Sequence, residues 1–299
     1  MADKIRLDQA VFSAGYAESR EKAKALIMAG VVYVNNQKAD KPGDTIKSDD
    51  VLEVRSNPLK YVSRGGLKLE KAINCYNLRL DNYVCADIGA STGGFTDCML
   101  QNGAKKVYAI DVGYGQLAWK LRSDERVINL ERTNFRYVTN EQIPEKLDFA
   151  SVDVSFISLS IIVPVMANLM DFDATAVCLI KPQFEAGKDK VGKKGVVRER
   201  SVHEEVVRKI LDYADSIGFE VMDLEYSPIK GPEGNIEYLM YIQKDALRSE
   251  QLAELTEKDA EDALAEIISA KTGITYDKEW SAKIDMVVER AHSCLDKPE

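Results

Sequence analysis

The chain has 299 residues, which is enough for one full α/β domain with a small companion. Hydrophobic residues make up 45% of it and charged residues 30%, an ordinary globular composition that argues against a disordered or fibrous chain. The five cysteines show no C-x-x-C spacing, so we expect a reducing compartment, without a disulfide framework or a metal site. Only two histidines are present, which makes histidine acid–base chemistry a poor expectation.

The net charge of −9 is unevenly distributed along the chain. Residues 245–299 carry fourteen acids against seven bases, so the first 244 residues sum to only −2. Within those, residues 181–200 carry seven bases against three acids. A local basic surface of this kind can hold phosphates whatever the total charge, so nucleic acid is not excluded as a partner.

Residues 1–56 are predicted to form a small α+β module. No signal peptide is expected, because the chain opens directly into a helix-like pattern that includes Ile5 and ends at Gly15. A second helix is predicted between Ser19 and Gly30. Short β-like runs and turns follow, at 31–34, 35–36, 41–44 and 51–54.

Residues 57–63 are predicted to be a linker, and residues 64–244 alternate between strand-like and helix-like segments. This alternation predicts a Rossmann-like α/β fold with a mainly parallel sheet that is covered on both faces. The strands are expected at Val84–Ile88, Val107–Asp111, Val127–Leu130, Phe149–Val154 and Thr175–Ile180. Two later runs, Glu220–Tyr226 and Ile236–Ile242, are predicted to form an antiparallel edge hairpin.

Two further segments are interpreted without a chemical role. The most apolar stretch, Phe156 to Met170, is too short and too interrupted to span a bilayer, so it is expected to be a strand end followed by a buried helix. Residues 245–299 are acidic and helix-prone, and are predicted to be a C-terminal extension that either packs on the domain or stays solvated.

A glycine-rich loop follows the first strand of the α/β domain, with the sequence Asp87-Ile-Gly-Ala-Ser-Thr-Gly-Gly-Phe-Thr-Asp97. Its glycines let the backbone approach a ligand closely, and Asp111 at the end of the next strand can accept hydrogen bonds from both hydroxyls of a ribose. The loop is neither G-x-G-x-x-G nor a Gly-Lys-Ser/Thr phosphate loop, which favours S-adenosylmethionine over nicotinamide or triphosphate cofactors. A tight glycine turn without a ligand is the structural alternative for the glycines alone.

Four charged residues lie where a packed α/β domain would not place them without a reason: Lys68, Asp153, Lys181 and Glu237. Apolar strands run directly into Asp153 and Lys181, whereas Lys68 and Glu237, taken singly, are better interpreted as solvated surface groups. Methyl transfer to a ribose 2′-hydroxyl requires that hydroxyl to be deprotonated or strongly polarised. A lysine can be the base if burial and a second ammonium lower its pKa, while flanking carboxylates orient it and oppose that shift.

At this point the sequence resembles the TlyA-type family, which is often labelled "hemolysin" and acts as ribosomal RNA cytidine-2′-O-methyltransferases. The resemblance covers roughly residues 4–268. It rests on the loop above and on four further motifs: Asp111-Val-Gly-Tyr-Gly-Gln-Leu-Ala-Trp119, Glu131-Arg-Thr-Asn134, Asp153-Val-Ser-Phe-Ile-Ser-Leu159 and Lys181-Pro-Gln-Phe-Glu185.

The resemblance implies an FtsJ-like domain with a catalytic Lys-Asp-Lys-Glu tetrad, which falls on Lys68, Asp153, Lys181 and Glu237. It implies an S-adenosylmethionine site at Asp87, Gly89, Ser91, Gly93, Gly94, Phe95, Asp111 and Asn134. The first module resembles the ribosomal S-four-like RNA-binding module. RNA-binding residues are therefore expected at Lys4, Arg6, Arg20, Lys22, Lys24, Lys41 and Arg64.

The leading hypothesis is thus a cytoplasmic, S-adenosylmethionine-dependent 2′-O-methyltransferase of ribosomal RNA or ribosomal subunits, with no DNA and no membrane as partner. The alternatives are a membrane-damaging hemolysin, for which the sequence offers no spanning or basic amphipathic segment, and a non-catalytic RNA-binding protein. The methylated nucleotide, the ribosomal subunit and the oligomeric state stay open.

Overall fold

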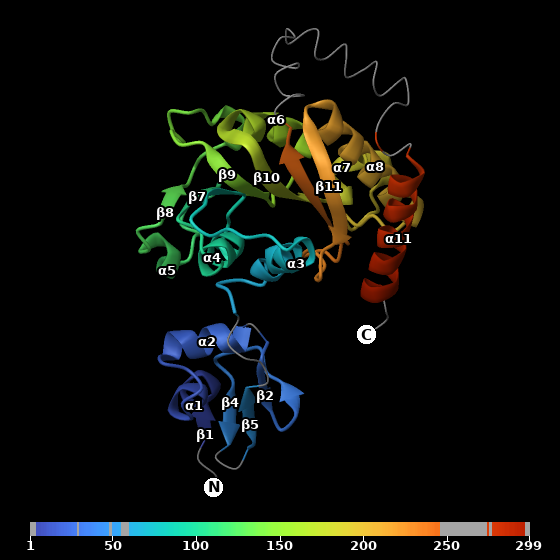
Figure 1. Ribbon diagram of the computed structural model, residues 1–299. Coiled ribbons are helices and arrows are strands. Elements are labelled where there is room, and N and C mark those ends of the chain that lie inside the picture. The colour runs from blue at the N-terminus through green and yellow to red at the C-terminus, as the bar shows by residue number, and fades with distance from the viewer. Residues whose placement is uncertain are drawn as a thin grey trace. The chain divides into compact units, whose positions relative to one another are not determined.

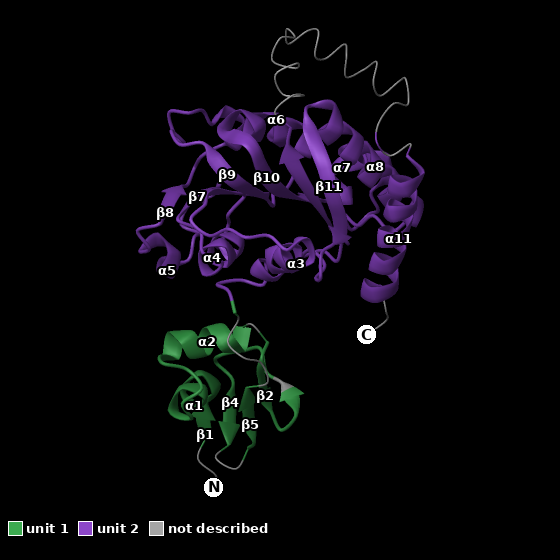
Figure 2. Cartoon of the chain, in the orientation of Figure 1, with its two compact units in different colours: residues 1–60 green, residues 61–299 purple. Residues whose placement is uncertain are grey.

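The structure is a computed structural model that describes residues 4–28, 30–47, 50–54, 60–245, 274 and 277–296. The chain divides into two compact units, residues 1–60 and residues 61–299 (Figure 2). Part of the expected linker, at 57–59, and the apolar positions 247–268 of the acidic extension lie outside the described residues.

The first unit is a small α+β module around its own apolar core. Its elements are β1 (Lys4–Arg6), α1 (Leu7–Ser13), α2 (Arg20–Met28), β2 (Val32–Val34), β3 (Gln37–Lys38), β4 (Thr45–Lys47) and β5 (Leu52–Val54). Leu7, Val11, Ile27 and Val32 are fully buried in that core, which explains why both helices form although each is short.

One expectation for this unit is wrong. Ile5 belongs to a strand that pairs with β4, and the first helix begins only at Leu7. The apolar residues at 5 and 7 fit an alternating strand as well as a helix, so periodicity alone could not distinguish them. The turn at Asn35 and Asn36 joins β2 to β3 with both residues at positive φ, a conformation that asparagine tolerates better than most residues.

The second unit contains a seven-stranded sheet. Its strands are β6 (Val84–Ile88), β7 (Lys106–Ile110), β8 (Val127–Leu130), β9 (Leu147–Val152), β10 (Met170–Ile180), β11 (Phe219–Tyr226) and β12 (Tyr238–Lys244). The spatial order is β11-β12-β10-β9-β6-β7-β8, and the five strands from β6 to β10 are mutually parallel. Only β12 runs antiparallel to both its neighbours, so the predicted mainly parallel sheet with a late hairpin is confirmed.

Helices cover both faces of this sheet (Figure 1). The helices are α3 (Gly66–Tyr76), α4 (Gly94–Gln101), α5 (Trp119–Arg122), α6 (Leu159–Leu169), α7 (Pro182–Glu185), α8 (Arg200–Ser216) and α11 (Lys278–Leu295). Residues of α3, α4 and α5 share one apolar core, and residues of α6, α8 and α11 share the other.

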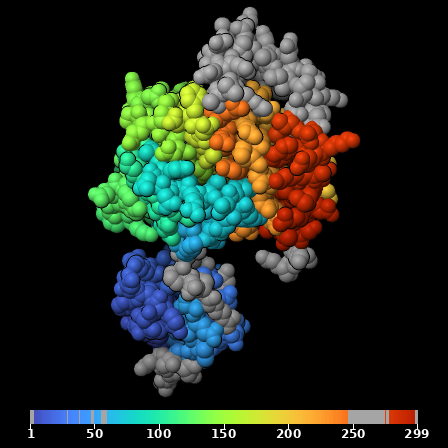
Figure 3. Space-filling model, in the orientation of Figure 1, coloured from blue at the N-terminus to red at the C-terminus, as the bar shows by residue number. Residues whose placement is uncertain are grey.

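The C-terminal helix α11 belongs to the second unit. Its buried face of Ile284, Val287, Val288 and Ala291 packs in the core that α6 and α8 also cover. In Figure 3 its red surface adjoins the orange surface of the preceding strands, in line with the contacts between α11, α8 and β11. Of the two possibilities for the C-terminal region, packing on the domain therefore holds for α11.

Candidate active site

The order of strands reverses between β6 and β9, because the chain passes from β6 to β7 and β8 and then returns to the other side of β6. In such sheets ligands bind beyond the carboxyl ends of the strands on either side of the reversal. Gly89 directly follows β6 and Asp153 directly follows β9. A Cβ on Gly89 would lie 2.5 Å from the carbonyl oxygen of Asp153, and Gly89 has φ +92°, so this close approach of two strand ends requires glycine.

The four candidate catalytic residues reach this edge from four different elements. Lys68 lies in the first turn of α3, Asp153 follows β9, and Lys181 follows β10. Glu237 directly precedes β12. Because β12 is antiparallel to β10, with Tyr238 opposite Ile180, its beginning lies at the same edge as the carboxyl ends of the parallel strands.

These residues form one continuous chain of ion pairs. Lys181 Nζ lies 2.5 Å from Asp153 Oδ1, and Lys68 Nζ lies 3.3 Å from Asp153 Oδ2. Lys68 Nζ also lies 2.6 Å from Glu237 Oε2. Asp153 is therefore shared by two ammonium groups, whereas Lys68 has two carboxylate partners and Lys181 has one.

The tetrad is largely withdrawn from solvent. The side chains of Lys68 and Lys181 are 8% and 7% exposed, that of Glu237 is 1% exposed, and that of Asp153 is 19% exposed. Although burial acts to lower the pKa of Lys68, the carboxylates of Asp153 and Glu237 raise it above its usual value. Burial acts to raise the pKa of Asp153, but Lys181 and Lys68 hold it below its usual value. Lys68 is thus a charged partner, and the lowered pKa that a lysine base requires does not apply to it.

Two neighbouring cavities open at this edge and share Gly89, Ser91, Asp153 and Ser155. The first, about 350 Å³, contains the whole tetrad. The second, about 400 Å³, extends toward the end of β7. A site divided in this way can hold a reacting group next to the tetrad in the first cavity and a nucleoside in the second cavity.

Most of the expected cofactor residues line one or both cavities. Asp87, Gly94 and Phe95 line the first, Asp111 and Asn134 line the second, and Gly89 and Ser91 line both. Gly93 lines neither. A side chain there would collide with Leu117 and Leu121, so its bare Cα serves the packing of the loop against α5.

Asp87 lines the first cavity and has one carboxylate oxygen without a partner in the described part of the chain. Its Oδ2 accepts hydrogen bonds from the amide and the hydroxyl of Thr96, at 2.8 and 2.6 Å. Its Oδ1 is buried and has no hydrogen-bond partner among the described residues. Burial raises the pKa of Asp87 to about 7, although the bonds from Thr96 act in the opposite direction. An unpaired buried acceptor is costly, and a cationic or N–H donor from a ligand would satisfy it.

Asp111 is already oriented at the mouth of the second cavity. Its two carboxylate oxygens accept hydrogen bonds from the amides of Ser91 and Gly113, at 2.8 and 2.7 Å. Each carboxylate oxygen has a second lone pair, so the group keeps acceptor capacity for ribose hydroxyls. The donor set of both cavities fits S-adenosylmethionine, which combines an ammonium, a carboxylate and a ribose.

Two residues of the site were not selected from the sequence. Ser155 Oγ lies 3.3 Å from Lys181 Nζ. The buried Glu185 accepts hydrogen bonds from Ser158 Oγ and from the amide of Leu159, at 2.7 and 2.8 Å, and so fixes the beginning of α6. Glu185 thereby ties the segment after Lys181 to the segment after Asp153. The motif Lys181-Pro-Gln-Phe-Glu185 contained the signal, since a carboxylate so close to an apolar strand end needs a buried partner.

The expected RNA-binding residues of the first unit divide into two kinds. Arg6 and Arg20 both pair with the buried carboxylate of Asp8, at 3.1 and 3.0 Å, while their own side chains stay 50% and 48% exposed. The guanidinium of Arg6 is the main cause that lowers the pKa of Asp8 to about 2. Two arginines are thus held side by side at the surface by one carboxylate.

Among the remaining basic positions, Lys24 is half-buried and the others are exposed. Lys22 pairs with Glu18 and Lys24 pairs with Glu21, so their charges are partly neutralised. Lys4 lies in β1 and Lys41 precedes the turn before β4; neither has an ion pair among the described residues. Arg64 belongs to the second unit and lines the tetrad cavity.

Among the described residues, no helix is long and apolar enough to cross a membrane.

Comparisons with known proteins divide the chain in the same way. The family model for FtsJ-like methyltransferases matches residues 61–244, and that for the S4 domain matches residues 5–52. The Bacillus subtilis protein YqxC, which carries a provisional rRNA methyltransferase name, is 52% identical over 80% of this chain and 85% of its own length. The Mycobacterium tuberculosis protein named 16S/23S rRNA (cytidine-2′-O)-methyltransferase TlyA is 40% identical over 90% of this chain and 99% of its own length.

Solved structures include one of a Streptococcus thermophilus protein that carries a provisional hemolysin name. It is 41% identical, and the match covers 99% of this chain and 98% of that one with a TM-score of 0.70. Relatives with the same architecture thus carry two different kinds of name.

Proposed function

The chain belongs to the TlyA-type family of FtsJ-like methyltransferases, and on this premise we propose that it transfers a methyl group from S-adenosylmethionine to the ribose 2′-hydroxyl of cytidine in ribosomal RNA. The observation that carries the proposal is the chain of ion pairs from Lys181 through Asp153 and Lys68 to Glu237. It places a lysine, Lys181, at a cavity. This lysine is buried enough for proton transfer, and neighbouring groups hold it in place.

The four residues have distinct roles in this proposal. Lys181 accepts the proton of the 2′-hydroxyl as a neutral amine, after its ammonium has released a proton to solvent; of the two lysines it is the one with a single carboxylate partner among the described residues, and that partner is shared. Asp153 orients Lys181 and compensates its charge. Lys68, held by Glu237 and Asp153, stays an ammonium and keeps Asp153 ionised through a 3.3 Å pair. General base catalysis of this type typically contributes 10²- to 10⁴-fold to a rate.

The residues around the tetrad support the choice of cofactor. When bound, S-adenosylmethionine supplies an electrophilic methyl group and brings no phosphate, in keeping with the lack of a phosphate-loop motif in the sequence. Asp87 Oδ1 would accept from its ammonium and Asp111 from its ribose. Gly89 lines both cavities and lets the ends of β6 and β9 approach closely.

Three observations support RNA as the substrate. A ribose 2′-hydroxyl exists only in RNA. The first unit matches an RNA-associated domain and presents the Arg6–Asp8–Arg20 cluster at its surface. The ribosomal and cytidine parts of the proposal rest on the name of the Mycobacterium tuberculosis relative, and they imply that the enzyme works in the cytoplasm, where ribosomes are.

The proposal is tested with the purified full chain, ribosomal subunits and isotopically labelled S-adenosylmethionine, followed by mass spectrometry of nuclease-digested RNA. We expect one or more 2′-O-methylcytidines with the wild type. We expect Lys181→Ala to lose about 10³-fold in single-turnover rate while keeping its melting temperature and its affinity for the cofactor. Lys105→Ala, an exposed lysine before β7, is the matched control and should retain full activity. Wild-type-like methylation by Lys181→Ala would exclude the assigned base.

A further inference from the structure

A basic loop connects α7 to α8, comprising residues 188–198. Four of its cations are exposed and form no ion pair with any residue that the structure describes: Lys188, Lys193, Lys194 and Arg198. Nearby cations differ, because Lys190 is paired with Glu205 at 2.5 Å and Arg200 with Glu204 at 2.8 Å. The loop therefore keeps four positive charges available for an external anion.

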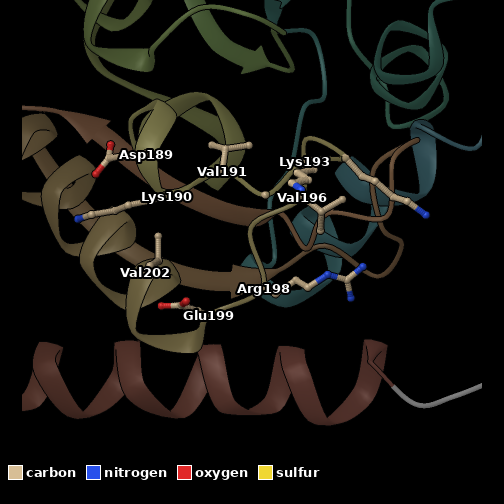
Figure 4. Close-up of a pocket in the computed structure, with 10 residues that line it drawn as sticks. Asp189, Lys190, Val191, Lys193, Val196, Arg198, Glu199 and Val202 are labelled. Carbon is tan, nitrogen blue, oxygen red and sulfur yellow. The ribbon is translucent and has the colours of Figure 1, made fainter.

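The basic loop borders a cavity of about 500 Å³, which ends at the first turn of α8. In Figure 4, Lys193 and Arg198 lie on one side of this cavity, and Asp189 and Lys190 lie on the other. Lys193 and Arg198 thus gather on one side of the cavity, and the acidic residues of its lining are Asp189, on the other side, and Glu199, next to Arg198.

The backbone of the basic loop is fixed from beneath by two buried residues. Asn235 accepts from the amide of Val197 at 3.0 Å and donates to the carbonyl of Gly195 at 2.9 Å. A ring nitrogen of His203 lies 3.0 Å from the carbonyl oxygen of Val197, which is itself buried. Because the backbone is held at Gly195 and Val197, it loses little further entropy on binding.

Both ends of this arrangement lead directly to the tetrad. The chain enters the basic loop through α7, which starts immediately after Lys181. Its anchor Asn235 is two residues from Glu237, and Pro232 of the same turn lines the tetrad cavity. The four cations are therefore attached to the same elements that position the proposed acceptor site.

We propose that the basic loop binds backbone phosphates of the RNA strand that flanks the methylated nucleotide, an inference that rests on the proposed function. Phosphate contacts position a nucleic acid, whereas the catalytic pocket selects the reacting group. An RNA strand fits better than a lipid surface, because none of the exposed large hydrophobic side chains of the described residues lies in this loop. Free lysines and an arginine on a fixed backbone are the groups expected for phosphate contacts.

The test compares two triple variants of the full chain that remove the same charge. One is Lys193→Gln, Lys194→Gln and Arg198→Gln in the basic loop. The matched control is Arg79→Gln, Lys105→Gln and Lys146→Gln, three exposed cations without an ion pair among the described residues. Arg79 lies between α3 and β6, and Lys105 and Lys146 precede β7 and β9, so all three lie toward the opposite edge of the sheet. Binding of wild type and both variants to ribosomal RNA is measured over a range of salt concentrations, and methylation kinetics are measured with RNA varied.

We expect the slope of log Kd against log salt concentration to be shallower by about 2 in the basic-loop variant, because each lost phosphate contact reduces this slope by roughly 0.7 to 0.9. Its KM for RNA should rise about tenfold with kcat and cofactor affinity unchanged, and the control should behave as wild type. An unchanged salt slope and KM in the basic-loop variant would overturn the inference, as would an equal effect in the control.

A second measurement separates this inference from the proposed function. If the wild type methylates no RNA, the proposed function fails, and the salt slope of binding still decides whether the basic loop contacts RNA. Sedimentation with phosphatidylglycerol vesicles tests the lipid alternative. Vesicle binding that the basic-loop variant abolishes, with RNA binding intact, would overturn the inference in favour of a membrane surface.

Discussion

The two units of this protein use the same arrangement of charges in opposite environments. In the first unit the buried carboxylate of Asp8 bridges Arg6 and Arg20, whose guanidinium groups remain half-exposed. In the second unit the carboxylate of Asp153 bridges Lys68 and Lys181, whose ammonium groups are buried. One carboxylate holds two cations in each case, but the cations are exposed arginines in the first unit and buried lysines in the second.

The difference separates binding from acid–base chemistry. Arginine stays charged at any accessible pH and offers a planar fork of donors, so an exposed pair suits phosphate recognition. Lysine is sensitive to burial and to nearby charge, so a buried pair suits proton transfer. The addition of Glu237 in the second unit provides Lys68 with a second carboxylate and leaves Lys181 as the proposed base.

The largest effect is expected from removing the central carboxylate of the buried cluster. Asp153→Asn leaves two buried ammonium groups with only Glu237 as a carboxylate partner, so we expect the methylation rate to fall by about 10³-fold or more. Rapid-quench measurement of a single turnover checks this. Asp8→Asn is the corresponding change in the exposed cluster and should leave the rate at saturating RNA unchanged. Equal losses in the two variants would contradict the comparison.

The next effect concerns stability. Lys68→Met leaves Glu237 buried without its ammonium partner, and we expect the free energy of unfolding to fall by about 3 to 5 kcal/mol. The double variant Lys68→Met with Glu237→Leu should recover most of that stability but none of the activity. Urea unfolding followed by tryptophan fluorescence measures this, since both tryptophans, Trp119 and Trp280, belong to the second unit. A double variant that stays as unstable as the single one would show that the pair itself stabilises the fold.

A smaller effect is expected at the exposed cluster. Asp8→Asn removes the charge that aligns Arg6 and Arg20, so we expect the affinity for RNA to fall by roughly tenfold, with kcat unchanged. Filter binding at two salt concentrations checks this. Lys47→Gln is a suitable control, because Lys47 is an exposed cation of the same unit that is not among the expected RNA-binding residues. If Asp8→Asn bound RNA more tightly than the wild type, the negative charge of Asp8 would repel RNA more than its alignment of the two arginines favours binding.

The last expected effects are on the pH dependence of stability, and they have opposite signs in the two units. The folded pKa of Asp8, about 2, is below its unfolded value, so its contribution is present above about pH 4 and is lost as the pH falls toward 2. The folded pKa of Asp87, about 7, is above its unfolded value. The second unit should therefore lose stability as the pH rises from about 4 to 7.

Amide hydrogen exchange between pH 4 and 8 measures the stability of each unit separately. It therefore distinguishes the effect of Asp87 on the second unit from any effect of pH on the first unit. Asp87→Asn should flatten the dependence in the second unit, and should weaken cofactor binding in the proposed function. A dependence that persists in Asp87→Asn would assign it to another group.

Much of the fold could be predicted because apolar strands and glycine turns are local signals. The alternation between residues 84 and 180 and the late hairpin appear in the structure nearly as expected. The strands β3 and β4 are too short for a periodic pattern, and the position of Ile5 fits both the period of a strand and that of a helix. The first residues of β10 were missed because Asp171-Phe-Asp173 is typical of a turn and not of a strand.

The candidate site was predictable as a set of residues but not as a set of contacts. Apolar runs that end in Asp153 and Lys181 indicate functional groups from the sequence alone. The pairing of Lys68 with Glu237, 169 residues apart, depends on the reversed direction of β12, and so does the sign of the pKa change at Lys68. The structure brings the four residues together, while their catalytic roles remain a proposal.

The division at Lys60 and Tyr61 has a further consequence for how tightly either unit needs to hold its substrate. Once one unit is bound to an RNA, a short covalent connection keeps the other at an effective concentration on the order of millimolar. In the proposed function, each unit can then bind weakly and still give a tight complex overall. The methyltransferase unit could release a modified nucleotide quickly, because the residence time on the RNA would not depend on it alone.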